Sequence, residues 1–156
     1  MEPTGKIAFV VGHSNWGKSS TLRALTKGDF RVRWHTISKV DFFIRRMSND
    51  DQEQGYIGFM DRITPAKYEA MIATLCPKLG DFENPAEKIL GNLRNKGFQL
   101  FFWVLEKEQG QGERVISKRE IAMLRRHGTI EINSGKFNSK KNAKLFSNFI
   151  SERVLA

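Results

Sequence analysis

Two glycines, a lysine and a serine occur at fixed spacing in residues 12–19, which read GHSNWGKS. Glycine adopts backbone conformations that a side chain hinders, so Gly12 and Gly17 allow the N–H groups of this stretch to turn inward around an anion. Lys18, expected to face solvent or the ligand, adds a positive charge toward the β- and γ-phosphates, and Ser19 offers a hydroxyl to Mg²⁺. The spacing therefore predicts a loop that binds the phosphates of a nucleoside triphosphate.

The residues on either side of this loop support the prediction. A buried apolar strand is expected over residues 6–11, and an amphipathic helix over residues 18–26. The helix directs the positive end of its dipole at the anion. Trp16 is expected to pack under the loop, because aromatic side chains usually serve burial, and His13 is expected to be a variable loop position rather than a catalytic base. The expected nucleotide-binding residues are Gly12, His13, Ser14, Asn15, Trp16, Gly17, Lys18, Ser19 and Ser20.

These residues resemble the Walker A motif of the P-loop NTPase superfamily, and the resemblance covers residues 6–26. Within this stretch, SNWGKSSTLRAL is similar to the first motif of small GTPases of the ribosome-assembly type, although Trp16 replaces a small residue there. Two other GTPase motifs are absent. Residues 51–55, DQEQG, are one residue longer than Asp-x-x-Gly, and residues 95–98, NKGF, lack the aspartate of Asn-Lys-x-Asp. The resemblance implies a Mg²⁺-dependent nucleotide site, with ATP favoured over GTP.

The resemblance also implies a carboxylate near the magnesium ion, at the end of a strand close to the loop. Glu106 follows the apolar run FFWVL, the pair Asp50 and Asp51 follows a strand expected to end near residue 47, and Asp41 lies inside that strand. The sequence leaves these alternatives open. The expected metal ligands are therefore Ser19 together with Glu106, Asp50 or Asp41.

Small P-loop kinases carry arginines on a mobile loop between their last helices, where the charge neutralises the transferred phosphoryl group. Residues 106–120, EKEQGQGERVISKRE, fit such a loop, because they combine two glycines with Arg114 and Arg119. The expected catalytic residues are Lys18, Glu106, Arg114 and Arg119.

The chain is strongly basic, with 26 Lys and Arg against 17 Asp and Glu and a formal net charge of +9. Such a balance favours anionic partners. Arg31, Arg33 and His35 alternate along one expected strand, and Arg45 and Arg46 end the next. These side chains suit contact with an anionic acceptor or a nucleic acid backbone, and they equally suit the protection of an edge strand by charge.

Two functions follow from these features. In the first, the protein is an enzyme that binds Mg·ATP and transfers or hydrolyses the γ-phosphate, with a small nucleotide or small-molecule kinase as the favoured subtype. In the second, the protein is a nucleotide-regulated binding module, a GTPase-like or ATPase-like switch, that contacts nucleic acid or a protein partner through its basic surface.

The elements that position these residues alternate along the chain. Strands are expected at residues 6–11, 30–37, 40–47, 98–105 and 129–132. Helices are expected at residues 18–26, from Thr64 to Leu75, from Asn84 to about Gly97, from Ser117 to about His127, and around residues 145–154, with a loop at residues 48–63. This order predicts a three-layer α/β sandwich with a mostly parallel sheet of about five strands, formed by a single domain over residues 1–156.

Composition excludes several other classes of protein. The apolar runs are shorter than the roughly 20 residues of a membrane helix, so no membrane partner is expected. One cysteine, Cys76, argues against a disulfide framework, and with three histidines it does not supply the ligands of a zinc site. We therefore expect a cytoplasmic protein.

Overall fold

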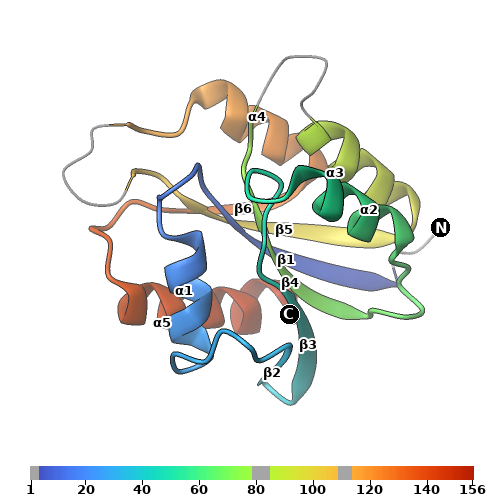
Figure 1. The fold of residues 1–156 in the computed structure, drawn as a ribbon, viewed down its shortest axis with the longest axis horizontal. Coiled ribbons are helices and arrows are strands. Elements are labelled where there is room, and N and C mark those ends of the chain that lie inside the picture. Colours follow the sequence, from blue (N-terminus) through green and yellow to red (C-terminus); the bar gives the residue numbers. More distant parts are fainter. Residues whose placement is uncertain (1–3, 79–84, 109–113) are drawn as a thin grey trace.

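A six-stranded sheet forms the centre of the structure, a computed structural model that describes residues 4–78, 85–108 and 114–156 (Figure 1). The strands are β1 (Gly5–Val11), β2 (Trp34–Ile37), β3 (Val40–Arg45), β4 (Ala70–Leu75), β5 (Phe98–Leu105) and β6 (Gly128–Asn133). They lie in the order β2-β3-β4-β1-β5-β6. β2 and β3 pair antiparallel, and the other neighbouring pairs are parallel. The predicted mostly parallel α/β fold is thus confirmed.

Helices cover both faces of this sheet and give the predicted three layers (Figure 1). α1 (Lys18–Leu25) and α5 (Ser139–Phe149) pack together on one face. α2 (Glu53–Arg62), α3 (Pro85–Asn95) and α4 (Lys118–His127) cover the other. A π-helical turn at Ile150–Val154 continues α5, and Lys6 of β1 donates a hydrogen bond of 2.7 Å to the carbonyl of Val154.

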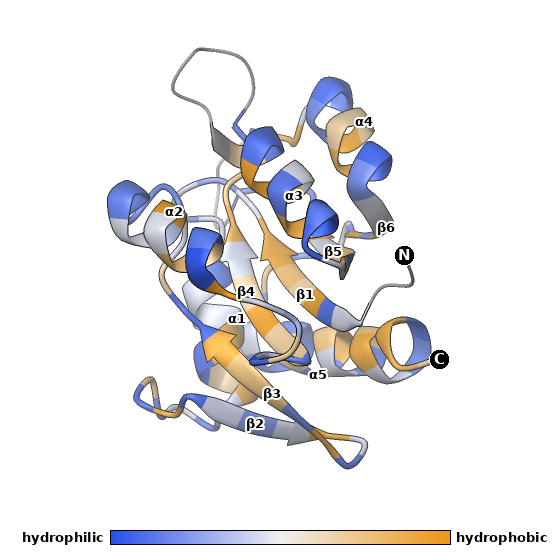
Figure 2. Cartoon of the chain, turned by 90° about the vertical axis from the view of Figure 1, so that its right-hand side faces the viewer, coloured by the Kyte–Doolittle hydropathy of each residue, from blue (hydrophilic) through white to orange (hydrophobic). Residues whose placement is uncertain are grey.

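The hydrophobic core follows the central strands (Figure 2). All residues of β5 except Gln99 are buried, which confirms the strand expected at residues 98–105. Phe102 of β5 stacks on Phe9 of β1 with ring centroids 5.4 Å apart. On the face covered by α5, Trp103 packs against Phe146 at 5.7 Å. Aromatic contacts therefore join the centre of the sheet to its helical layer.

β4 corrects the helix expected between Thr64 and Leu75. The apolar residues at positions 68, 71, 72 and 75 have helical spacing, but all six residues of β4 are buried. β4 lies between β1 and β3, so both of its faces are covered and an uninterrupted apolar run suits it. A short apolar run does not distinguish a buried strand from a buried helix, and here the sheet decides. This strand accounts for the sixth member of the sheet.

α2 corrects the loop expected at residues 48–63. Two glycines and several polar residues suggest a loop there, yet residues 53–62 form a helix. Tyr56 and Met60, four residues apart, bury one face of this helix. The hydroxyl of Tyr56 donates a hydrogen bond of 2.8 Å to the carbonyl of Thr74 in β4. Packing on the sheet thus offsets the weak helix propensity of glycine.

The other elements differ from expectation mainly at their ends. β2 begins at Trp34 rather than at residue 30, and α5 begins at Ser139, ahead of the apolar residues that revealed it. α4 begins as expected, because Ser117 accepts a hydrogen bond from the N–H of Glu120 while the Glu120 carboxylate accepts one from the N–H of Ser117.

The parallel strands β1, β3, β4, β5 and β6 end at one edge of the sheet. The loops that follow them therefore gather at this edge, and their described residues include 12–17, 46–52, 106–108, 114–117 and 134–138. The loop of residues 12–17, which contains Gly12 and Gly17, thus lies at this edge. In the described ranges, no helix has the length and apolar character needed to cross a membrane.

The contact between α2 and β4 can be tested through Tyr56. We expect Tyr56→Phe to lower the free energy of unfolding by about 1 to 2 kcal/mol, because a buried hydrogen bond to a backbone carbonyl is lost. Tyr68→Phe is the control, since Tyr68 is only partly buried. Urea unfolding followed by circular dichroism measures both. Equal stability of Tyr56→Phe and the wild type would contradict the docking of α2 on β4.

Candidate functional site

The loop between β1 and α1 requires glycine at two positions, for different reasons. Gly17 has a φ of 105°, in the left-handed region, and a Cβ there would lie 2.1 Å from the Cε2 atom of Phe137. Asn15 also lies in the left-handed region, which asparagine tolerates. Gly12 does not have a positive φ. A Cβ there would lie 3.3 Å from the Cβ of Trp16, so space, rather than the backbone freedom expected from sequence, favours glycine.

The start of α1 leaves backbone donors without a side-chain partner. Gly17 occupies the N-cap position and supplies no capping side chain, and the first turn of α1 contains no acidic residue. The first N–H groups of a helix have no acceptor within the helix, and they carry the positive end of its dipole. The loop therefore presents donors and positive potential to an anion.

The side chain of Lys18 lies within this loop and is buried, so it does not face open solvent, one of the two orientations expected for it. Its Nζ atom donates hydrogen bonds to the carbonyl of Gly12 at 2.6 Å and to the carbonyl of His13 at 3.2 Å. The Asp50 carboxylate lies 3.4 Å from the same atom. These contacts hold a positive charge among the loop carbonyls.

Asp50 is the expected carboxylate that lies beside the loop. Its Oδ2 atom accepts a hydrogen bond of 2.6 Å from the hydroxyl of Ser14 and faces the Lys18 ammonium, while its Oδ1 atom accepts one from the hydroxyl of Ser48. The side chain is 5% exposed. A buried carboxylate needs such partners, because an unpaired charge is costly away from water.

A pair of amide hydrogen bonds places Asp50 in this position. The side chain of Asn49 donates to the carbonyl of Cys76 at 2.9 Å and accepts from the N–H of Cys76 at 2.7 Å. Cys76 directly follows β4, so this pair fixes the loop after β3 to the end of β4. Asp51 has a local role, since its carboxylate accepts from the N–H of Ser48 at 3.1 Å and closes the turn.

A cavity of about 210 Å³ lies between the loop and these carboxylates, and Lys18, Ser19, Asp50 and Asp51 are among its lining residues. A hydroxyl and a carboxylate therefore face the same space, as Mg²⁺ prefers oxygen ligands. The described residues contain no group of three or more His, Cys, Asp or Glu that could hold a metal by themselves. Mg²⁺ commonly takes one or two carboxylates and completes its shell with substrate phosphates and water, so this donor set fits Mg²⁺ bound together with phosphates.

The other two carboxylate positions lie elsewhere. Asp41 is near the start of β3, at the opposite edge of the sheet, and accepts a hydrogen bond from Thr36 on β2. Glu106 is at the correct edge, but it lines a different, larger cavity of about 460 Å³ with Trp16. Of the candidate carboxylates, Asp50 and Asp51 are therefore the ones that line the cavity beside Lys18.

The two expected catalytic arginines do not line the cavity at the loop. Arg114 is exposed, and its backbone pairs with Glu108 through hydrogen bonds of 3.0 and 3.2 Å. Arg119 is exposed in the first turn of α4. Residues 109–113 of the expected mobile loop, including its two glycines, lie outside the described residues.

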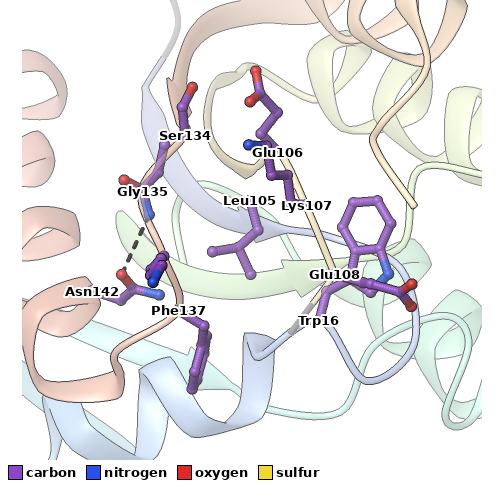
Figure 3. Close-up of a pocket in the computed structure, with 11 residues that line it drawn as sticks. Trp16, Leu105, Glu106, Lys107, Glu108, Ser134, Gly135, Phe137 and Asn142 are labelled. Carbon is purple, nitrogen blue, oxygen red and sulfur yellow. Dashed lines mark hydrogen bonds between the residues drawn. The ribbon is translucent and has the colours of Figure 1, made fainter. Parts of the chain in front are cut away.

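Trp16 packs under the loop, as predicted, with 1% of its surface exposed. It lines the larger cavity together with residues from the loops after β5 and β6 (Figure 3). Glu106, Glu108 and Phe137 belong to these loops, so carboxylates and an aromatic ring surround this space. The cavity lies at the same sheet edge as the loop between β1 and α1.

His13 is tied to two other elements and is more than a variable loop position. Its Nε2 atom lies 2.6 Å from the Glu120 carboxylate of α4, and its Nδ1 atom lies 3.6 Å from the sulfur of Cys76. Contacts with Cys76 and then with Glu120 raise the pKa of His13 to about 9, although burial opposes them. Burial raises the pKa of Glu120, but hydrogen bonds from His13 and Ser117 outweigh this and lower it. His13 is therefore an imidazolium near neutral pH.

Four residues of this site were missed in the sequence. Asn49 is adjacent in sequence to the candidate carboxylate Asp50, and Cys76 follows β4, which was expected to be part of a helix. Glu120 was recognised only as part of the capping box of α4. Phe137, whose ring covers Gly17, gives no sequence signal at all. Each acts across a contact between segments far apart in the chain.

No family model matches this chain, and a search of curated proteins finds no matching sequence.

The ion pair of His13 predicts a pH dependence of stability. A histidine with a raised pKa stabilises the folded state below its unfolded pKa of about 6.5, and this contribution disappears as the pH rises to about 9. We expect the free energy of unfolding to fall by roughly 2 to 3 kcal/mol across this interval. In Glu120→Gln, which retains a residue able to cap α4, the fall should be smaller.

Histidine NMR titration provides the direct measurement. Burial is the main cause that lowers the pKa of both His35 and His127, so these two should titrate below about 6.5 and His13 alone near 9. Three histidines that all titrate below 7 would contradict the contacts assigned to His13.

Proposed function

We propose that this protein binds a nucleoside triphosphate, with ATP as the expected nucleotide, together with Mg²⁺, and cleaves or transfers the γ-phosphate. The observation that carries the proposal is the position of Asp50, which faces Lys18 in the cavity that Ser19 lines. Under this proposal the protein is a P-loop NTPase, the superfamily whose Walker A motif the loop resembles.

A site for Mg²⁺ and phosphates needs both positively and negatively charged groups. Lys18 and the N–H groups at the start of α1 favour an anion. Asp50 alone would repel a triphosphate, so a cation is needed between the carboxylate and the phosphates. When bound, Mg²⁺ would neutralise charge on the β- and γ-phosphates and orient them.

The two cavities divide the nucleotide between them. The cavity of about 210 Å³ at the loop is smaller than the roughly 300 to 1,000 Å³ of sites for whole small ligands, so it suits the phosphates. The neighbouring cavity of about 460 Å³ suits the nucleoside. Its carboxylates, from Glu106 and Glu108, can accept hydrogen bonds from the amino group of adenine and equally from that of guanine.

In the reaction, an acceptor hydroxyl or water attacks the γ-phosphorus, and the bond from this phosphorus to the β–γ bridging oxygen breaks. Lys18 would stabilise the negative charge that develops on the β-phosphate, and the loop would keep the phosphates in line with the nucleophile. The kinase subtype rests on Arg114 and Arg119, which would have to move toward the cavity. Apart from these two arginines, the same residues would serve both transfer to an acceptor and hydrolysis.

Nucleotide binding can be tested by calorimetry with Mg·ATP and Mg·GTP. We expect Lys18→Ala to weaken binding by roughly 10- to 100-fold, because a hydrogen bond to a charged phosphate is worth about 1.5 to 3 kcal/mol. Lys144→Ala is the control, since Lys144 is an exposed lysine on α5. Lys18 is buried, so thermal unfolding must first show that the variant is folded at the temperature of the assay. Unchanged affinity in folded Lys18→Ala would overturn the assignment of the loop.

The role of Asp50 can be separated from that of Glu106. We expect Asp50→Asn to bind nucleotide but to lose roughly 100-fold in the rate of phosphate release, as other losses of transition-state electrostatics do. Asparagine keeps the shape of the side chain and can still accept from Ser14. Glu106→Gln should keep the wild-type rate. The opposite pattern, with Glu106 essential and Asp50 dispensable, would contradict the geometry.

A further inference from the structure

A groove of about 670 Å³ shares no lining residue with the cavity at the phosphate loop. It lies beside β3, which pairs with the edge strand β2; Figure 2 shows where these two strands lie in the sheet. The residues that precede β2, the end of β3, α2 and the segment after α2 line it. Six of its lining residues are basic, namely Arg31, Arg33, Arg45, Arg46, Arg62 and Lys67. Among the described residues that line it, none is acidic.

Two of these cations serve the structure of the groove itself. Arg46 donates to the carbonyl of Val32 at 2.8 Å and to the hydroxyl of Thr26 at 3.0 Å, so it holds the segment before β2 against β3. Arg45 lies over the ring of Phe59, 5.0 Å from its centroid. Both side chains are only partly exposed.

The other four cations are exposed and available to a partner. Arg31 contacts Asp29 at 3.5 Å, but its side chain is 83% exposed, so this contact is weak. Arg33, Arg62 and Lys67 make no ion pair with any carboxylate of the described residues. The groove therefore presents several cations that the protein does not neutralise.

Aromatic rings accompany these cations. Phe30 and Trp34 are 60% and 55% exposed, which is unusual for such large apolar side chains. The ring of Trp34 packs edge-on against Phe43 at 5.3 Å, and Phe43 in turn contacts Tyr68 at 5.0 Å. Trp34 does not line the groove itself, but its contact with Phe43, which does, places its ring next to the groove.

We propose that this groove binds single-stranded nucleic acid. A single strand offers phosphates to the free cations and unstacked bases to the exposed rings, and proteins that bind such strands combine these two features. A duplex keeps its bases stacked inside, and an acidic peptide has no planar bases, so neither uses Trp34 and Phe30 in this way. The site is separate from the phosphate loop and does not depend on nucleotide binding.

The test is fluorescence anisotropy with a labelled single-stranded oligonucleotide of about 12 residues, within the usual site sizes of about 4 to 16 nucleotides. Four phosphate contacts predict that log K falls with log[salt] with a slope of about −3. Trp34→Ala should weaken binding at least about fivefold, because stacking on one ring is worth about 1 to 3 kcal/mol, and Trp34→Phe should retain most of the affinity. Binding should also quench tryptophan fluorescence, since Trp16 and Trp103 are buried and Trp34 is exposed.

Charge reversal separates this groove from the general basic surface. Arg33→Glu should weaken oligonucleotide binding at least tenfold, whereas the matched control Arg125→Glu, on the exposed face of α4, should not. Lys18→Ala should bind the oligonucleotide like the wild type, so failure here and failure at the nucleotide site are distinguishable. Equal affinity for duplex or for an acidic peptide of the same charge, or equal effects of Arg33→Glu and Arg125→Glu, would overturn the proposal.

Discussion

A buried pair of opposite charges, the ammonium of Lys18 and the carboxylate of Asp50, is the constraint on which the site depends. Each charge is costly alone at this depth, because the loss of hydration must be offset by a partner and by hydrogen bonds. The pair joins the loop after β1 to the loop after β3. Since β4 lies between these strands, β1 and β3 do not pair directly, and their loops must meet above the end of β4. The pair thus links the two loops across the end of β4 and places both charges in the cavity.

Two further sets of contacts connect these loops to neighbouring elements. Asn49 and Cys76 join the loop after β3 to the end of β4 through two hydrogen bonds. Glu120 joins His13, in the loop between β1 and α1, to the start of α4. One oxygen of its carboxylate contacts the histidine, and the other accepts the hydrogen bond from the N–H of Ser117. These contacts fix the position of the loop between β1 and α1 relative to α4, and that of the loop after β3 relative to β4.

Local patterns in the sequence predicted what depends on local chemistry. The glycine spacing identified the loop, the apolar run identified β5, and Ser117 with Glu120 identified the start of α4. What depends on tertiary packing was missed or left open. Residues 64–75 have helical spacing but form a buried central strand, because only the sheet order shows that both faces are covered. The position of Asp50 beside Lys18 likewise depends on tertiary contacts, because Asn49 binds Cys76 and holds the loop after β3 against the end of β4.

The most direct test of the account is an NMR titration of the labelled protein with Mg·ATP, followed through its backbone amides. The account predicts that the largest shifts fall on Ser14, Asn15, residues 17–20, Asp50 and Asp51, since these residues line the cavity at the start of α1. Amides of the β2–β3 edge, where the basic and aromatic groove lies, should change little. Shifts confined to that edge, or no shifts at saturating Mg·ATP, would contradict the assignment of residues 12–19 as a phosphate-binding loop.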